Sequence, residues 1–118
     1  MSRRSNPIRA VQLCHETLLW LVPQLDHFPR NRRFTLGERL ESHLLGVMAD
    51  LIEARYSRRK LKSLQQANRQ LAVARHLWRL SFELKTINER RYHYGAKLFV
   101  ALGLQIGGWI KQREGSNQ

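Results

Sequence analysis

The sequence has few of the residues that interrupt or cross-link a chain. Its 118 residues include three prolines, seven glycines and one cysteine. The single cysteine, Cys14, excludes an internal disulfide, which agrees with a reducing compartment, and no partner pattern accompanies it, so we interpret it as a structural thiol. No stretch approaches the ~20 apolar residues of a transmembrane helix. Because no signal-type apolar core precedes Arg9 either, we expect a cytoplasmic protein that does not enter a membrane.

Acidic residues are also scarce. Nine Asp and Glu stand against 21 Lys and Arg, which gives a formal net charge of +12 and a pI of about 11.3. The acids are scattered, whereas a nuclease or polymerase site needs clustered carboxylates to hold metal ions. A glycine-rich phosphate loop and a nucleophile elbow are missing as well. We therefore expect no enzyme activity and no cofactor.

Histidines raise the question of a metal site. Metal-binding helix bundles place carboxylates and Glu-x-x-His pairs on facing helices. Glu89 and His93 are four residues apart, and Glu41 lies two before His43, so neither pair has that spacing. We expect isolated surface or capping histidines and no metal site at any of the five positions, His15, His27, His43, His76 and His93.

Helical periodicity extends over most of the sequence. Apolar residues recur three and four positions apart, and no run alternates as a strand would. The pattern predicts helices over about 8–28, 36–57, 60–85 and 89–112. Because segments of this length joined by short connections favour antiparallel neighbours, we predict an all-α, single-domain, up-down-up-down four-helix bundle over residues 1–118.

Local signals refine the boundaries of these helices. Pro23 should kink the first helix or split it near Trp20, because it removes an internal hydrogen bond. Thr35 and Glu38 have capping-box spacing, which predicts that the second helix starts with Thr35 as its N-cap. Either Asn88 or Thr86 can cap the last helix.

Apolar positions predict the core and a surplus beyond it. The first helix has Val11, Leu18, Leu19, Val22 and Leu25 as expected core positions, widened by Trp20 and Leu21. The second has Leu40, Leu44, Val47 and Leu51, flanked on the same broad face by Leu45, Met48 and Ile52. The third has Leu61, Leu64, Ala67, Leu71, Ala74, Leu77, Trp78 and Leu84, and the fourth has Tyr92, Gly95, Phe99, Leu102, Ile106 and Trp109. Gly103 and Gly107 are four residues apart, which predicts either a close approach by another helix or a loosened C-terminal end. The second and fourth helices carry apolar residues on more than one stripe. Such a surplus is often buried between subunits, so we expect a homo-oligomer.

Arginine and lysine form the candidate binding site. Their clusters fall in the first connection, in the second connection, along the third helix and at the start of the fourth. A bundle of this topology places basic charge at both ends and along one flank. Arginine pairs with phosphate oxygens and stacks on unpaired bases, which favours binding of RNA or DNA. The candidates are Arg30, Arg32, Arg33, Arg55, Arg58, Arg59, Lys60, Lys62, Arg69, Arg75, Arg79, Arg90 and Arg91.

Other interpretations of this charge remain open. It could form an ordinary solvated face, with Arg39 paired to an acid and Arg91 solvated. It could also complement an acidic protein partner in a pure assembly protein. The sequence resembles no zinc finger, RNA-recognition sheet or basic zipper, so base-specific recognition is not expected.

Three blocks of sequence resemble a known family. They are Phe28-Pro29-Arg30-Asn31-Arg32-Arg33-Phe34-Thr35-Leu36-Gly37-Glu38-Arg39-Leu40-Glu41, Glu53-Ala54-Arg55-Tyr56 and Gly107-Gly108-Trp109-Ile110-Lys111. The blocks are similar to the accessory variability determinant of diversity-generating retroelements. Related bundles include the ribosomal intervening-sequence proteins, which are the alternative branch. The positive charge favours the retroelement branch.

The resemblance implies a four-helix protomer that assembles into a pentameric barrel with a basic surface. It implies association with a reverse transcriptase and template RNA during mutagenic copying into a variable gene, with no catalytic residue of its own. It also implies that Phe34, Thr35, Gly37 and Trp109 determine the fold. The role of the arginines rests on their charge alone.

Overall fold

The computed structural model describes residues 7–116, and this part of the chain is helical without any strand. The four long helices are α1 (Pro7–Leu25), α3 (Glu38–Tyr56), α4 (Lys60–Glu83) and α5 (Glu89–Ser116). A short helix, α2 (Arg30–Arg32), and a π-helical turn, η1 (Arg33–Gly37), lead into α3. The prediction of an all-α chain with four long helices is confirmed, and the bundle measures 48 × 28 × 20 Å.

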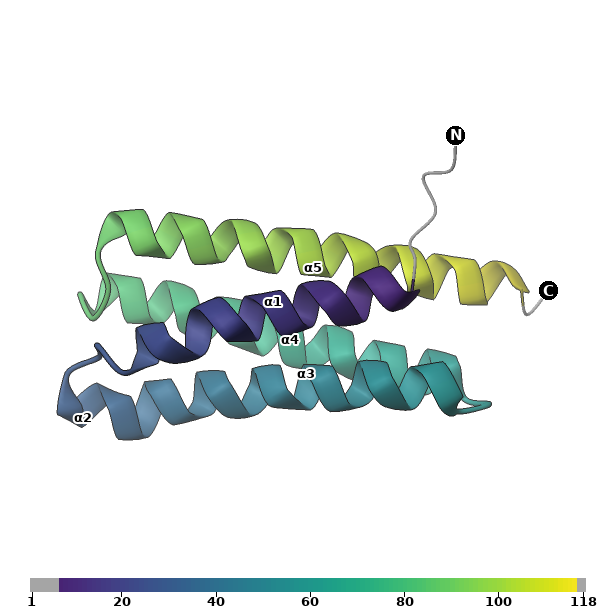
Figure 1. Ribbon diagram of the computed structural model, residues 1–118, viewed down its shortest axis with the longest axis horizontal. Coiled ribbons are helices and arrows are strands. Elements are labelled where there is room, and N and C mark those ends of the chain that lie inside the picture. Colours follow the sequence, from purple (N-terminus) through teal and green to yellow (C-terminus); the bar gives the residue numbers. More distant parts are fainter. Residues whose placement is uncertain (1–6, 117–118) are drawn as a thin grey trace.

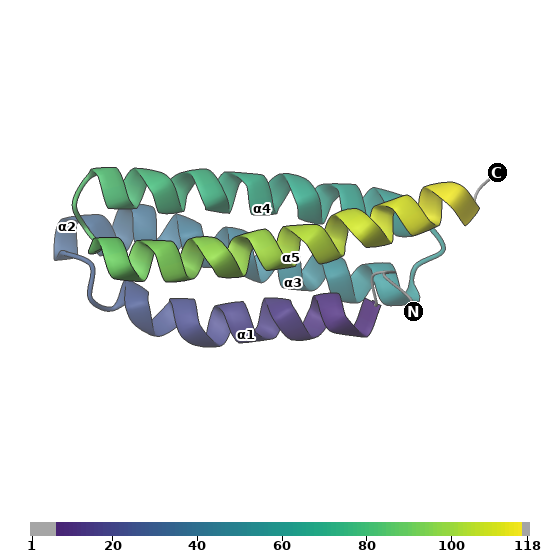
Figure 2. The same ribbon diagram turned by 90° about the horizontal axis from the view of Figure 1, so that it is seen from above.

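Each long helix packs against two others. The contacts join α1 to α3 and α5, and α4 to the same two helices, so α3 and α5 lie at diagonally opposite corners. Figure 1 shows successive long helices running in opposite directions along the long axis, and Figure 2 shows the same order from above. The α3–α4 connection therefore lies at one end of the bundle, and α2 and the α4–α5 connection lie at the other.

The core forms along the centre of this bundle. In the second helix the central predicted positions are buried, but flanking Leu45 and Ile52 are 50% and 45% exposed, so the predicted face is too broad. In the third and last helices the predicted positions are buried or half-buried, apart from Leu84, which is 42% exposed. The prediction for the first helix is confirmed at Leu21 and Leu25 but wrong at Leu19, which is 64% exposed, and it omits Cys14, which is fully buried. Thr17 shares the buried face because its hydroxyl donates a hydrogen bond of 2.7 Å to the Leu13 carbonyl oxygen.

The start of the second helical segment differs from the prediction. It begins at Arg30, because the Pro29 carbonyl oxygen accepts hydrogen bonds of 2.8 Å from both Arg32 N–H and Arg33 N–H. Thr35 is no N-cap: its hydroxyl lies inside the π-helical turn and donates to the carbonyl oxygens of Asn31 and Arg32 at 3.2 and 3.3 Å. The predicted basic connection is thus the first turn of a helix.

Two further predictions at helix ends are resolved. The first helix is not split near Trp20; α1 continues through Pro23 and ends at Leu25. At the start of α5 the Asn88 side-chain oxygen accepts a hydrogen bond of 2.8 Å from Arg91 N–H, so Asn88 is the N-cap. Thr86 instead donates its hydroxyl hydrogen to the Ser81 carbonyl oxygen at 2.8 Å.

The expected approach of another helix to Gly103 and Gly107 is not found within this chain. A Cβ atom at Gly103 would make ordinary contact with Leu71, at 3.6 Å, and one at Gly107 would have no neighbour within 4 Å. The close approach occurs at Gly95, where a Cβ atom would lie 2.7 Å from the Trp78 ring. The outer glycines of α5 therefore leave space on the surface of the protomer.

Candidate nucleic-acid interface

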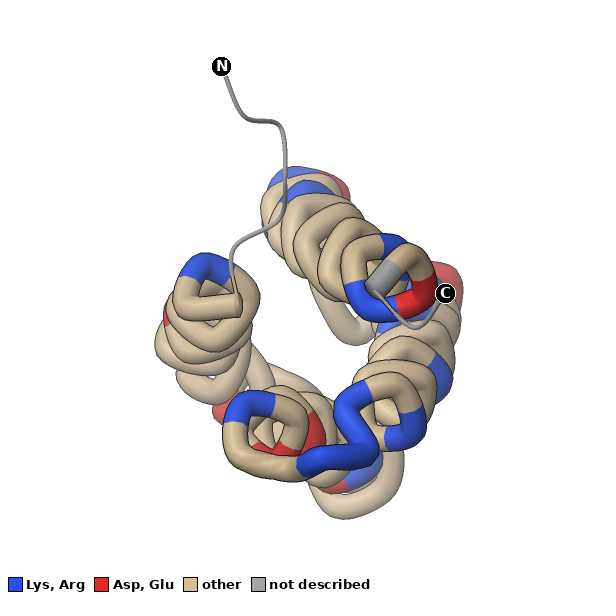
Figure 3. The backbone as a smooth tube through the Cα atoms, turned by 90° about the vertical axis from the view of Figure 1, so that its right-hand side faces the viewer, with Lys and Arg blue, Asp and Glu red and all other residues tan. Residues whose placement is uncertain are grey.

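Positive charge without any acid extends over the end of α3, the α3–α4 connection and nearly all of α4. Residues 54–82 contain no Asp or Glu. Figure 3 views the bundle from this end and shows Lys and Arg positions filling the connection. The cations of this acid-free surface, all of them predicted candidates, are Arg55, Arg58, Arg59, Lys60, Lys62, Arg69, Arg75 and Arg79.

The cations at the connection have two different roles. Lys60 Nζ donates hydrogen bonds to the carbonyl oxygens of Ala54 and Arg55, at 2.8 and 3.0 Å. These carbonyls belong to the last turn of α3, where a cation satisfies unpaired acceptors and interacts favourably with the helix dipole. The Arg58 and Arg59 side chains are exposed. Lys60 therefore closes α3, while the two arginines are free to bind a ligand.

An exposed aromatic ring lies among these cations. Tyr56 is 79% exposed, and the Arg55 guanidinium carbon lies 5.7 Å from the centre of its ring. A tyrosine face beside arginines provides stacking for an unpaired base next to charge for its phosphate. Tyr56 was not among the predicted site residues, although an aromatic residue at a helix end beside cations is a usable signal.

The arginines along α4 are not equivalent. Arg69 and Arg75 are exposed, and neither forms an ion pair in the described chain. Arg79 forms an ion pair with Glu83 at 2.9 Å, and the hydrogen bond from its guanidinium to that carboxylate raises the pKa of Arg79. Along this flank Arg69 and Arg75 are therefore better candidates for binding phosphate than Arg79, which already has an acidic partner.

The opposite end of the bundle carries mixed charge. Arg33 lies 3.6 Å from both Asp26 and Glu41, and Glu89 lies 3.7 Å from His93. These acids share the end with the remaining predicted candidates, Arg30, Arg32, Arg90 and Arg91. The α3–α4 end also has acids, Glu53 on α3 and Glu114 on α5, but neither forms an ion pair in the described chain, so its cations are the less compensated.

The structure also adds cations that the sequence argument did not select. Lys111 and Arg113 lie near the end of α5, which points toward the α3–α4 end in Figure 1. Arg113 is half-buried, and its Nε atom has no hydrogen-bond partner in the described chain. The alternating direction of the helices predicts from the sequence that the end of α5 lies beside the α3–α4 connection, and this signal could have identified both residues.

Arg39 is exposed and forms no ion pair within residues 7–116, so the suggested pairing of Arg39 with an acid is wrong.

Other kinds of site find little support in residues 7–116. These residues include no group of three or more His, Cys, Asp or Glu side chains placed to hold a metal ion. Cys14 is buried, and its burial raises the pKa of the thiol to about 12. No helix in this part of the chain is long and apolar enough to cross a membrane.

The fold and the charge together define a class: small, strongly basic four-helix-bundle proteins. Within that class the chain belongs to the bAvd-like family, whose match covers residues 9–113. Membership supports an accessory role in diversity-generating retroelements and suggests a non-catalytic subunit. The resemblance to the accessory variability determinant is thereby confirmed. Searches of curated proteins and of solved structures gave no match.

Proposed function

We propose that this protein is a non-catalytic subunit that binds template RNA, or the DNA copied from it, for a retroelement reverse transcriptase in the cytoplasm. The observation that carries the proposal is the acid-free surface at the α3–α4 end, where Arg58 and Arg59 are exposed. Such a surface binds a phosphate backbone by releasing condensed counterions. The polymerase supplies the chemistry and this subunit holds the nucleic acid.

The proposed binding is tolerant of sequence. The surface presents arginines and one exposed ring, Tyr56, at a helix end, and no element shaped to enter a groove and read base edges. Phosphate contacts set the affinity, and stacking on Tyr56 adds a contact that any base can make. A template that must be copied whatever its sequence requires this kind of binding.

We further propose that the antiparallel up-down-up-down bundle is the protomer of a pentameric barrel. Exposed large apolar side chains on several helices support an assembly, among them Phe34, Leu45 and Leu104. A ring would repeat the basic end around one axis. Several weak phosphate contacts would then act on one nucleic-acid strand and raise the overall affinity.

The test of binding compares two matched double variants. Arg58→Ala with Arg59→Ala removes two exposed arginines from the acid-free surface, and Arg30→Ala with Arg90→Ala removes two exposed arginines at the mixed end. Affinity for a fluorescent single-stranded RNA is measured from low to high salt. The first pair should weaken binding the more and lower the slope of log K against log[salt] by about 0.7 per lost contact. A flat salt dependence of the unaltered protein would refute the proposal.

A second experiment separates nucleic-acid binding from pure assembly, because +12 could instead complement an acidic protein. The protein is co-purified with its reverse transcriptase with and without nuclease. We expect it to retain the enzyme and to protect bound RNA from digestion. Retention of the enzyme without any protection of RNA would favour the assembly protein.

A further inference from the structure

A stripe of exposed apolar side chains follows the outer face of α3. Leu45 and Ile52, seven residues apart, are 50% and 45% exposed, and Ala49 lies exposed between them. Phe34, 62% exposed, lines a hollow with Leu45 at the start of this face. We call Phe34, Leu45, Ala49 and Ile52 the α3 stripe. Its seven-residue spacing is that of a seam between packed helices.

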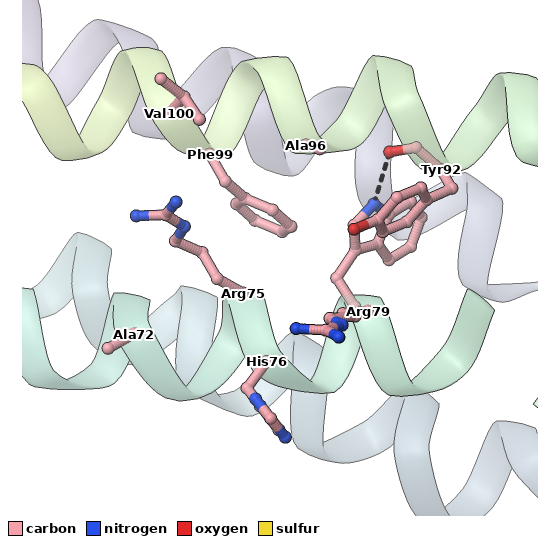
Figure 4. A pocket seen from close by; sticks show the side chains of 9 residues that line it. Ala72, Arg75, His76, Arg79, Tyr92, Ala96, Phe99 and Val100 are labelled. Atoms are coloured by element: carbon pink, nitrogen blue, oxygen red, sulfur yellow. Dashed lines mark hydrogen bonds between the residues drawn. The ribbon is translucent and has the colours of Figure 1, made fainter. Parts of the chain in front are cut away.

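A groove lies between α4 and α5, on a different face of the bundle from the α3 stripe. Its walls include Ala72 and Arg75 on α4, and Val100, Gly103 and Leu104 on α5. Val100 and Leu104 are 47% and 71% exposed. Figure 4 shows part of this α4–α5 groove, with Arg75 extending from α4 toward α5 beside Phe99. The groove thus has apolar residues on its α5 wall and two arginines, Arg75 and Arg79, on its α4 wall.

The two surfaces differ in the sign of their charge. Glu38 and Glu53 lie on the exposed side of α3 and form no ion pair in the described chain. The groove has Arg75 within it and Lys97 beside it on α5, and both are exposed without an acidic partner. An apolar stripe with acids at its edges complements an apolar groove with cations at its edges.

We propose that the α3 stripe of one copy of this chain packs into the α4–α5 groove of the next copy. The inference rests on the oligomer in the proposed function and names the two faces that form its contact. Because the two faces are different and do not overlap on the protomer, the contact is heterologous, as the contacts in a closed ring with an odd number of subunits must be.

The glycines of α5 fit this arrangement. A Cβ atom at Gly107 would meet nothing within 4 Å in the protomer, and Gly103 borders the groove. Two glycines on one helix surface let another helix backbone approach closely, at a cost of about 1 kcal/mol each in helix propensity. In the assembly that space receives the α3 stripe. This contact would cover Arg75, which would then not be available to nucleic acid, whereas Arg58, Arg59 and Lys62 lie outside both surfaces and stay available.

The experiment uses one disruptive variant of each face. Leu45→Asp places a charge in the α3 stripe, and Leu104→Asp places one in the α4–α5 groove. Each variant, purified after nuclease treatment in high salt, should have the mass of a single chain by light scattering. Leu19→Asp is the control, because Leu19 is 64% exposed on α1, outside both surfaces. It should keep the mass of the unaltered protein, and circular dichroism checks that all three variants stay helical.

Mixing the two disruptive variants tests that the contact is heterologous. A chain with Leu104→Asp still has an intact α3 stripe, and a chain with Leu45→Asp still has an intact groove. One good contact therefore forms, and native mass spectrometry of a concentrated equimolar mixture should show a two-chain species that neither variant forms alone. Absence of that species overturns the proposal.

Two other outcomes separate this inference from the function it rests on. An oligomeric unaltered protein whose Leu104→Asp variant keeps its mass but loses RNA affinity would make the groove a nucleic-acid site and overturn the inference alone. A monomeric unaltered protein would overturn both the inference and the proposed assembly. RNA binding at the α3–α4 end would stand in either case.

Discussion

Gly95 on α5 makes room for the Trp78 ring of α4. A Cβ atom there would lie 2.7 Å from the Trp78 ring. That ring cannot move aside freely, since it is 1% exposed and its Nε1–H donates a hydrogen bond of 2.9 Å to the Tyr92 carbonyl oxygen. The absence of a side chain at Gly95 therefore leaves the space that the buried Trp78 ring occupies.

We therefore expect Gly95→Ala to destabilise the protein by about 1–3 kcal/mol, the usual cost of overpacking a core, despite better helix propensity. Chemical denaturation measures the loss. Gly107→Ala is the matched control, because nothing in the protomer lies within 4 Å of the added atom. It should leave stability unchanged or raise it by up to about 1 kcal/mol. Equal effects of the two substitutions would contradict this account.

Cys14 should be inert while the protein is folded. With the pKa of its buried thiol raised to about 12, the thiolate fraction at pH 8 is on the order of 10⁻⁴. A disulfide reagent should label it only in denaturant, and fast labelling of the native protein would contradict the burial.

The same shift predicts a pH dependence of stability. The folded protein holds the Cys14 proton more tightly than the unfolded chain, whose thiol titrates near pH 8.5. The contribution of the protonated Cys14 thiol to the free energy of unfolding is therefore complete below about pH 8.5 and is lost as the pH rises toward 12. The free energy of unfolding should fall more steeply between about pH 9 and 10 in the unaltered protein than in Cys14→Ala. Parallel slopes would argue against the shift.

At the scale of single residues, the periodicity of the sequence correctly predicts many buried positions that carry large apolar side chains. Leu44 and Phe99 are examples, since both are buried as expected. In the first helix the prediction is wrong at Leu19, because the buried face also carries the small residues Ala10, Cys14 and Thr17, which stand out less in an apolar pattern than leucine does. Thr17 can be buried on this face because its hydroxyl donates a hydrogen bond to the Leu13 carbonyl oxygen. That bond depends on backbone geometry, which a hydropathy pattern does not contain.

At the scale of elements, the basic residues at the junction between α3 and α4 have two different roles. Lys60 closes the end of α3 through two carbonyl oxygens, whereas neighbouring Arg58 is exposed. The sequence placed both residues in a single basic cluster. The contact that separates them spans the turn and depends on where α3 ends.

Two single substitutions should separate these roles. Lys60→Ala should lower the free energy of unfolding by about 1 kcal/mol, because carbonyls at the end of α3 lose a charged partner. Arg58→Ala should change stability by less than about 0.5 kcal/mol but weaken RNA binding. Thermal denaturation and the RNA titration are read on the same preparations. A stability loss for Arg58→Ala equal to that for Lys60→Ala would place both residues in the helix end.

The entry to α3 shows the limit of motif reasoning about elements. Thr35 and Glu38 have capping-box spacing, which predicts a helix from residue 36, yet the helix starts six residues earlier, at Arg30. Pro29 supplies the extended backbone and the first carbonyl acceptor, so the N-terminus is already formed before Thr35 is reached. The turn at Arg33–Gly37 then widens to a π-helix. A spacing rule cannot choose between two starts when both have suitable residues.

At the scale of the whole molecule, the sequence predicted basic charge at both ends but not the difference between them. That difference depends on where the nine acids lie. Asp26 is distant from Glu41 in the sequence, and the fold brings both within 3.6 Å of Arg33. The acid-free span between Glu53 and Glu83 becomes one surface because α4 turns back beside α3. Position of charge rather than net charge therefore defines the candidate site.

Two substitutions with the same change in net charge test that conclusion. Gln66→Glu puts a single acid on the exposed face of α4, one helical turn from Lys62 and from Arg69. Gln12→Glu puts one on the exposed face of α1. If the position of the charge determines binding, Gln66→Glu should weaken RNA binding about fivefold, which corresponds to roughly 1 kcal/mol of Coulomb energy at water-like permittivity. Gln12→Glu should have little effect.

Both variants should keep the mass of the unaltered protein, because neither position lies in the α3 stripe or the α4–α5 groove. The loss of RNA affinity caused by Gln66→Glu should become smaller as the salt concentration is raised, because mobile ions screen an exposed charge. Equal weakening by the two substitutions would mean that nucleic acid responds to the overall field of the protein. The acid-free surface would then have no special role in binding.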